Sequence, residues 1–226
     1  MGFSVEITGK YACFSRPELK VERVSYDIIT PSATRGILEA VFWKPAIRYV
    51  IDEIRVCHPI QFENIRRNEV NSKASKSKDH IFTSEDRTQR ASMVLKNVKY
   101  VITAHFESVK EKLNLLNKPD GETCDTFADG TFNHGKFTEM ITRRIKKGQC
   151  FHQPYLGTRE FPATLRLIED GNLPAAIAEN RNFGIMLYDI DYQKDKNGDV
   201  TAFNPTYFRA EMKQGLIDLR NVEVLR

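Results

Sequence analysis

Apolar residues recur at every second position in two parts of the chain. Residues 3–7 read Phe-Ser-Val-Glu-Ile, and residues 98–106 interleave Val, Tyr, Ile, Ala and Phe with Lys, Val, Thr and His. Successive side chains of a strand point to opposite faces of a sheet. The pattern therefore predicts two strands, each with one buried face.

Two other segments repeat apolar residues every three or four positions, which predicts helices at 31–43 and 133–147. The first begins at Pro31 and stops before Pro45, and the second is followed by Gly148, which is suited to end it. The expected apolar faces are Ile37, Leu38, Val41 and Phe42 in the first helix, and Phe137, Met140, Ile141 and Ile145 in the second.

The remaining segments complete an α+β pattern. They predict strands at 47–62, with a break at Pro59, and at 154–168, 185–192 and 207–219. Residues 71–79 predict a mobile basic loop, and residues 120–130 an acidic one. The order strand, helix, strand, strand, helix, strand is typical of a ferredoxin-like or RRM-like fold. We expect an RRM-like domain at 1–170 and a C-terminal antiparallel β-sheet extension at 171–226.

Composition narrows the class of protein. The chain has 226 residues, 41% of them hydrophobic and 28% charged, with a formal net charge of +4. That small excess permits an anionic partner without requiring one. No apolar run approaches the ~20 residues of a membrane-spanning helix and no signal peptide is visible, so we expect a cytoplasmic protein without membrane association. The four scattered cysteines do not fit a zinc site and are expected to be buried small side chains.

No motif of a nucleotide cofactor, a zinc hydrolase or a nucleophilic serine is present, so neither a cofactor nor a metal is expected. The informative segment is 134–160, where basic and histidine side chains outnumber the two glutamates. Lys136, Arg143 and Lys147 form one stripe on the second helix, because the seventh and eleventh residues onward return to within about 20° of the first. Such a stripe suits nucleic-acid phosphates, although a charged run of this kind is more often only a solvated helix face.

Residues 148–161 place aromatic and histidine side chains between two glycines. Their rings could stack on bases while backbone N–H groups approach phosphates. They could equally form an ordinary helix-to-strand connection with aromatic core residues. The residues alone leave both interpretations open.

A series of motifs then follows the order of a known family. They are YACFSRPE at 11–18, SYD at 25–27, PSATRGILEA at 31–40, FWKP at 42–45, IDEIRV at 51–56, AHF at 104–106, GK at 135–136 and YLGTREF at 155–161. Together they resemble, over nearly the whole chain, the type I-C CRISPR-associated protein of Cas family five, subtype d (the Dvulg subtype).

The resemblance implies an RRM-like domain with a β-sheet extension. It further implies a protein that binds the repeat hairpin of precursor CRISPR RNA and cuts it without metal, using the RNA 2′-hydroxyl. Such a protein stays on the 5′ handle of the crRNA, together with the other subunits of the type I-C Cascade complex.

In this family the resemblance implies catalysis by a tyrosine in the first helix and a lysine followed by a histidine at the start of the second. The corresponding positions here are Phe42, Lys136 and Phe137, so only the lysine is kept. His134 is the nearest side chain that can take a proton near neutral pH, with Tyr11, Tyr49 and His152 as weaker candidates. Lys136 and His134 are therefore the expected catalytic residues. The expected RNA contacts are Arg35, Trp43, Lys44, Arg143, Lys146, Lys147, His152 and Arg159.

Two functions remain open at this stage. One is a repeat-specific endoribonuclease, and the other is a non-cleaving subunit that holds the crRNA handle. A third option, a nuclease that takes DNA, is weaker because no carboxylate cluster suits two metal ions.

Overall fold

The computed structural model describes residues 2–226 except 20, 78, 110–131, 170 and 196–198. Its central sheet places β6 (Thr164–Ile168), β1 (Gly2–Ala12), β5 (Arg87–Ser108) and β3 (Ile47–Val56) side by side, with every neighbouring pair antiparallel. These are the fourth, first, third and second strands of the predicted strand–helix order. That arrangement is the ferredoxin-like fold, so the predicted fold class is confirmed.

Both predicted helices are present, as α1 (Pro31–Val41) and α3 (His134–Lys146). Each is capped by a side-chain oxygen: Thr30 accepts a hydrogen bond from the Ala33 N–H at 3.1 Å, and Asn133 accepts one from the Lys136 N–H at 3.0 Å. Gly148 follows α3 with φ +62°, a left-handed conformation that glycine adopts without steric cost.

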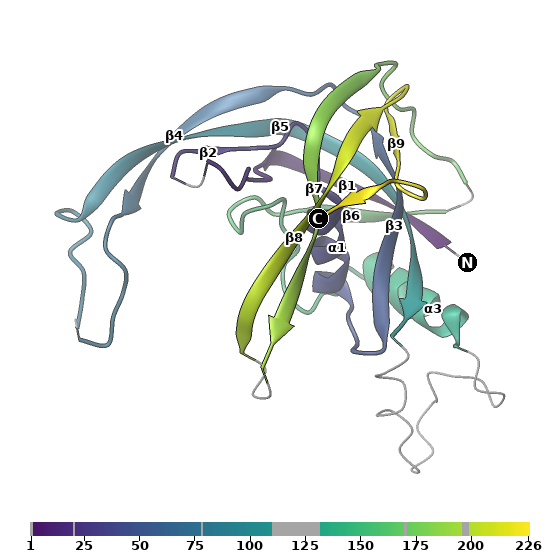
Figure 1. The fold of residues 1–226 in the computed structure, drawn as a ribbon, viewed down its shortest axis with the longest axis horizontal. Helices are drawn as coiled ribbons and strands as arrows, with labels where there is room; N and C mark the ends of the chain where they lie inside the picture. The colour runs from purple at the N-terminus through teal and green to yellow at the C-terminus, as the bar shows by residue number, and fades with distance from the viewer. Residues whose placement is uncertain (1, 20, 78, 110–131, 170, 196–198) are drawn as a thin grey trace, which may run out of the picture.

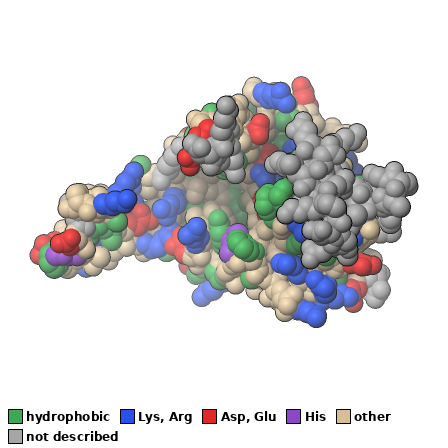
Figure 2. Space-filling view, turned by 90° about the horizontal axis from the view of Figure 1, so that it is seen from below, with side chains coloured by type: hydrophobic (Ala, Val, Ile, Leu, Met, Phe, Trp, Pro, Cys, Tyr) green, Lys and Arg blue, Asp and Glu red, His purple; other side chains and the backbone are tan. Residues whose placement is uncertain are grey.

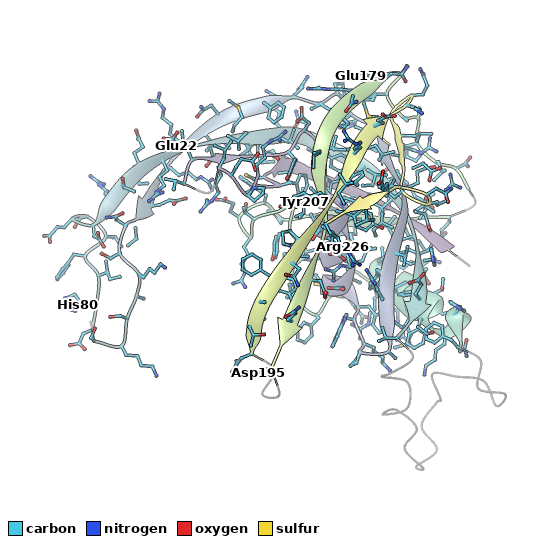
Figure 3. All side chains as sticks on the ribbon, in the orientation of Figure 1. Glu22, His80, Glu179, Asp195, Tyr207 and Arg226 are labelled. Carbon is cyan, nitrogen blue, oxygen red and sulfur yellow. The ribbon has the colours of Figure 1, made fainter. Side chains whose placement is uncertain are left out.

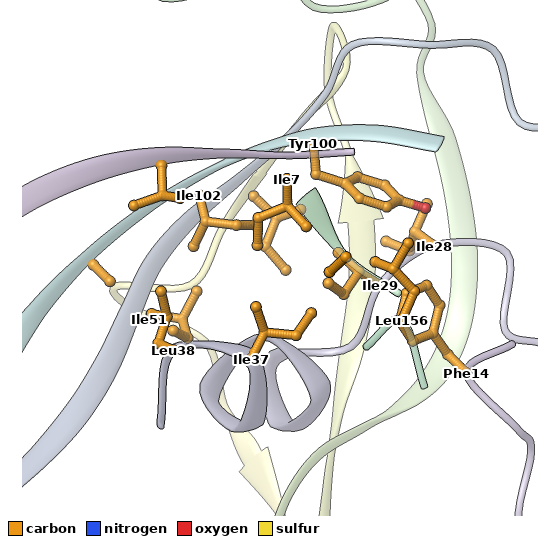
Figure 4. Close-up of a cluster of buried hydrophobic side chains, with 14 of the residues drawn as sticks. Ile7, Phe14, Ile28, Ile29, Ile37, Leu38, Ile51, Tyr100, Ile102 and Leu156 are labelled. Atoms are coloured by element: carbon orange, nitrogen blue, oxygen red, sulfur yellow. The ribbon is translucent and has the colours of Figure 1, made fainter. Parts of the chain in front are cut away.

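The core lies between α1 and the central sheet (Figure 4). Ile37 and Leu38 of α1 face Ile7 of β1 and Ile102 of β5, and all four side chains are buried. The polar neighbours of these strand residues, such as Thr103, lie on the opposite face of the sheet. The alternation in the sequence thus predicted which face of each strand is buried.

A long two-stranded arm was not predicted from the sequence. β4 (Phe62–Val70) pairs with residues 87–95 of β5, and the short β2 (Arg23–Val24) pairs with the same part of β5. Figure 1 shows this arm reaching far from the central sheet. Because much of the arm is exposed to solvent, β4 has no continuous apolar face that alternation could reveal. Residues 71–79 lie in the connection at its end and, where described, contain no helix or strand, as predicted.

The C-terminal part forms a second antiparallel sheet in the order β10-β8-β7, made by β7 (Arg181–Lys194), β8 (Val200–Met212) and β10 (Val224–Leu225). The predicted β-sheet extension is therefore confirmed. β7 packs against α1, while β9 (Leu216–Asp218) returns to the central sheet beside β3. The boundary at residue 170 stays a prediction.

Some local predictions were wrong. Residues 154–163 do not form a strand but a looped connection, in which Gly157 has φ +85° and lies against the backbone of Cys13. Cys150 is exposed rather than buried, because it follows the end of α3 on the surface. The predicted acidic loop at 120–130 and Cys124 lie outside the described residues. In the described part of the chain, no helix is both long and apolar enough to cross a membrane.

Candidate functional site

The C-terminal end of α1 organises the region where most of the predicted site residues lie. The last carbonyl groups of a helix have no partner within it and must find one elsewhere. Here their partners lie outside α1. The Ala40 oxygen accepts from the N–H groups of Phe151 (2.8 Å) and His152 (3.3 Å), the Val41 oxygen from the Arg144 guanidinium (3.1 Å), and the Phe42 oxygen from the Tyr49 hydroxyl (2.6 Å). These bonds fix α3 and the segment after it against α1.

The two positions that lack the family's proton-transfer groups meet in an aromatic cluster. Phe42 and Phe137 are 3% and 0% exposed, and their ring centroids lie 6.3 Å apart. Phe137 also stacks on Phe132, with ring centroids 4.9 Å apart, and lies beside Phe106, with ring centroids 6.2 Å apart. The family resemblance implies proton-transfer groups at these two positions. In the structure the two positions lie side by side, and both are occupied by apolar rings.

Lys136 and His134 lie beside this cluster, in the first turn of α3. The Lys136 ammonium is 5.7 Å from the centroid of the Phe137 ring, and its side chain is half-buried. His134 is exposed, with its ring edge-on to Phe132 at 4.7 Å. Both therefore sit at the positive end of the α3 dipole, where a negative charge is favoured.

Two of the weaker candidates for a general base, the tyrosines, are engaged elsewhere. The Tyr49 hydroxyl donates to the Phe42 carbonyl, and burial raises the pKa of Tyr49, so this group is held as a protonated donor. The Tyr11 hydroxyl donates to Glu63 at 3.2 Å. Of the proposed bases, His134 is the one that lies on α3, two residues before Lys136.

The stripe predicted on α3 is present. Arg143 and Lys147 are exposed and Lys136 is half-buried, while Phe137, Ile141 and Ile145 face the core. Figure 2 shows Lys and Arg side chains gathered beside hydrophobic side chains and a histidine on the face seen from below. The remaining predicted RNA contacts around the α1 end are Trp43 (53% exposed), Lys44 (half-buried) and His152 (exposed).

Three predicted RNA contacts lie in other surroundings. Arg35 is half-buried between Glu39 (2.8 Å) and Asp189 of β7 (2.7 Å), so two carboxylates balance its charge. Lys146 forms an ion pair with Glu169. Arg159 is exposed in the turn between Leu156 and Phe161. All three stay predictions, with Arg35 placed to join α1 to the second sheet.

Comparison with known proteins adds to this geometry. Residues 3–220 match the family described as CRISPR-associated protein (Cas_Cas5). The chain is 46% identical to the CRISPR pre-crRNA endoribonuclease Cas5d of Mannheimia succiniciproducens, covering 95% of this chain and 93% of that protein. It is 37% identical to the protein of the same name from Thermus thermophilus, covering 95% and 90%. A crystal structure of a CRISPR-associated protein superimposes with a TM-score of 0.67 at 21% identity, over 98% of this chain and 92% of the other.

Proposed function

This chain belongs to the Cas5d family of CRISPR-associated proteins, and from that premise we propose that it is a pre-crRNA endoribonuclease. It binds the repeat hairpin of the precursor RNA and cuts one strand without a metal ion. It then stays on the 5′ handle of the product as a subunit of type I-C Cascade.

Cleavage without metal makes three chemical demands. A base removes the proton of the RNA 2′-hydroxyl, whose oxygen then forms a bond to the adjacent phosphorus. A cation stabilises the charge that develops on the phosphoryl oxygens, and an acid protonates the leaving 5′-oxygen as its bond to phosphorus breaks. The products are a 2′,3′-cyclic phosphate and a free 5′-hydroxyl.

The observation that carries the proposal is the position of Lys136. Its ammonium and the positive end of the α3 dipole lie together beside the aromatic cluster, where they can stabilise an anionic transition state. Arg143 and Lys147 continue the same helix face and supply positive charge for flanking phosphates. His134, two residues before Lys136 and exposed, is assigned as the general base.

A second function has a specific observation in its favour. Phe42 and Phe137 cannot transfer protons, and both are locked in the buried cluster. If His134 does not serve as a base, the chain has the means to hold an RNA but not to cut it. The alternative is therefore a non-cleaving subunit that binds the crRNA handle.

The deciding experiment incubates the protein with end-labelled repeat RNA in EDTA, beside the same RNA with a 2′-deoxy nucleotide at the scissile position. We expect the first RNA to be cut and the second to stay intact. Lys136→Ala should lower the single-turnover rate by about 10²–10³-fold while much of the hairpin affinity remains, because other basic residues still hold the backbone. Lys213→Ala, which removes the same charge at an exposed position just after β8, is the matched control and should cut at the wild-type rate.

The role of His134 is tested in the same assay. His134→Ala should slow cleavage by about 10²-fold or more. Wild-type protein that binds repeat RNA and leaves it intact at stoichiometric amounts would instead establish the handle-binding function.

A further inference from the structure

Phe151 is the most exposed large hydrophobic side chain in the described part of the chain, with 86% of its surface accessible. An apolar ring of this size normally gains free energy by burial. A side chain that stays out of the core at such a position indicates an interaction with something outside the chain.

The exposure is not the result of a loose backbone. The N–H groups of Phe151 and His152 both donate to the Ala40 carbonyl, at 2.8 and 3.3 Å. Just before them, Gly148 ends α3 with the N–H of Gln149 bonded to the Arg144 carbonyl at 2.9 Å. The ring is therefore held outward by a backbone that is fixed on both α1 and α3.

The next residues fix the segment on its other side. Pro154 and Leu156 are buried, and the Leu156 carbonyl accepts the Cys13 N–H at 3.0 Å. Residues 149–153 thus form a short exposed bridge between two anchored points. A ring presented on such a bridge loses little conformational freedom when it binds a ligand, which favours affinity.

The surroundings of the ring are basic and aromatic. Residues 143–153 contain five Lys, Arg and His side chains and no carboxylate. Trp43, 53% exposed, leaves the same end of α1 to which Phe151 is bonded, and the His152 ring lies edge-on to that of Phe151 at 5.9 Å. A protein partner would need an acidic surface here, whereas RNA brings phosphates for the cations and flat bases for the rings.

We infer that Phe151 is a stacking platform for an unpaired nucleobase of the repeat RNA, next to the phosphates bound by Arg143 and Lys147. Stacking accepts any base but needs that base outside a duplex. The platform therefore selects the single-stranded segment at the foot of the hairpin and positions it relative to Lys136. This inference rests on the proposed function and deepens it, since it names the part of the substrate that the site contacts.

The test measures the Kd of labelled repeat RNA for the full-length protein with three substitutions at Phe151 and one control substitution elsewhere. Phe151→Ala should weaken binding by about ten-fold. Phe151→Trp should bind at least as well as the wild type, and Phe151→Leu should resemble the alanine variant, because leucine keeps apolar bulk but has no π face. Phe203→Ala, at a position 64% exposed on β8, is the matched control and should bind like the wild type. Since the ring is exposed, all variants should unfold at the wild-type temperature.

An abasic scan of the RNA locates the stacked base. Removing that base should weaken wild-type binding as much as Phe151→Ala does, and combining the two changes should cost nothing further. The inference is overturned if Phe151→Ala binds the RNA with wild-type affinity, or if Phe151→Leu does. The exposed ring would then be assigned to contact with a protein partner. Failure of the wild-type protein to bind repeat RNA at all would instead contradict the proposed function.

Discussion

Phe42 and Phe137 contribute packing at the two positions where the family resemblance implies proton-transfer groups. Both rings are buried, and Phe137 stacks on Phe132. A polar group introduced there would lose its hydration without gaining a partner, which commonly costs about 1–3 kcal/mol. Under the proposed function, proton transfer would therefore fall to the exposed edge of the cluster, where His134 lies.

Glu6 gives a second example of a single side chain with a measurable role. On the outer face of the central sheet it accepts two hydrogen bonds from Arg166, at 2.8 and 3.0 Å, and lies 3.0 Å from the Lys99 ammonium. These partners, Arg166 first, hold the pKa of Glu6 below its usual range despite the opposing effect of burial. The cluster joins β6, β1 and β5.

Glu6→Gln should consequently lower the melting temperature in a pH-dependent way. Because the folded-state pKa lies below that of the unfolded chain, the charged form stabilises the fold above the ordinary glutamate pKa of about 4.3, and this stabilisation is lost as the pH falls through the folded-state value. The difference between wild type and variant should be largest near pH 7 and vanish once the pH lies below the folded-state pKa of Glu6. Thermal unfolding followed by circular dichroism checks this. A pH-independent difference, or an equal effect of Glu85→Gln at an exposed site, would refute it.

At the scale of elements, two faces of α3 have different surroundings, one buried and one exposed to solvent. One face packs into the core through Phe137, Ile141 and Ile145, and the adjoining face exposes Arg143 and Lys147. A charge change on the second face should therefore leave folding intact.

We expect Arg143→Ala combined with Lys147→Ala to weaken RNA binding and to reduce the slope of log K against log salt concentration by about two units, one for each lost phosphate contact. The measurement is a salt titration of repeat-RNA affinity. Arg209→Ala with Lys213→Ala, two exposed changes near the end of β8, removes equal charge and should leave the slope unchanged. If both pairs change it equally, only net charge matters and α3 is not the binding face.

At the scale of the whole molecule, the β4–β5 arm and the second sheet extend from the central sheet. Figure 3 shows His80 near the far end of the β4–β5 arm, while Asp195 marks the tip of the β7–β8 hairpin on a different side. Arg35 ties α1 to Asp189 of β7, and β9 pairs with β3, and both contacts help to attach the second sheet to the centre. The arm is joined to the centre through β5 and the short β2.

The arm connection at 71–79 has too few apolar side chains to form a core of its own. Trypsin should therefore cut the free protein first at Lys73 and Lys76, before sites within the sheet such as Lys99, and bound repeat RNA or Cascade subunits should slow that cleavage. Mass spectrometry of the early fragments identifies the sites. Equal cleavage with and without partners would make the segment a passive linker.

The local sequence determined the positions of those strands and helices that bury one face. The alternation at 98–106 and the helical spacing around Ile37 and Ile141 each appear within about ten residues, because burial of one face imposes its own period. The basic stripe on α3 follows from the same geometry, and the order of elements was enough to predict the ferredoxin-like fold.

Tertiary structure alone decided the rest. The arm has little buried surface to mark it in the sequence, so only the pairing of β4 with β5 reveals it. Contact between Phe42 and Phe137 needs α1 and α3 to pack side by side. The direction of the Phe151 side chain depends on the group that accepts its backbone N–H. That group is the carbonyl of Ala40 in α1, far away in the sequence. A site assembled from such distant residues produces no periodic pattern in the sequence, because its contacts form only when the chain folds.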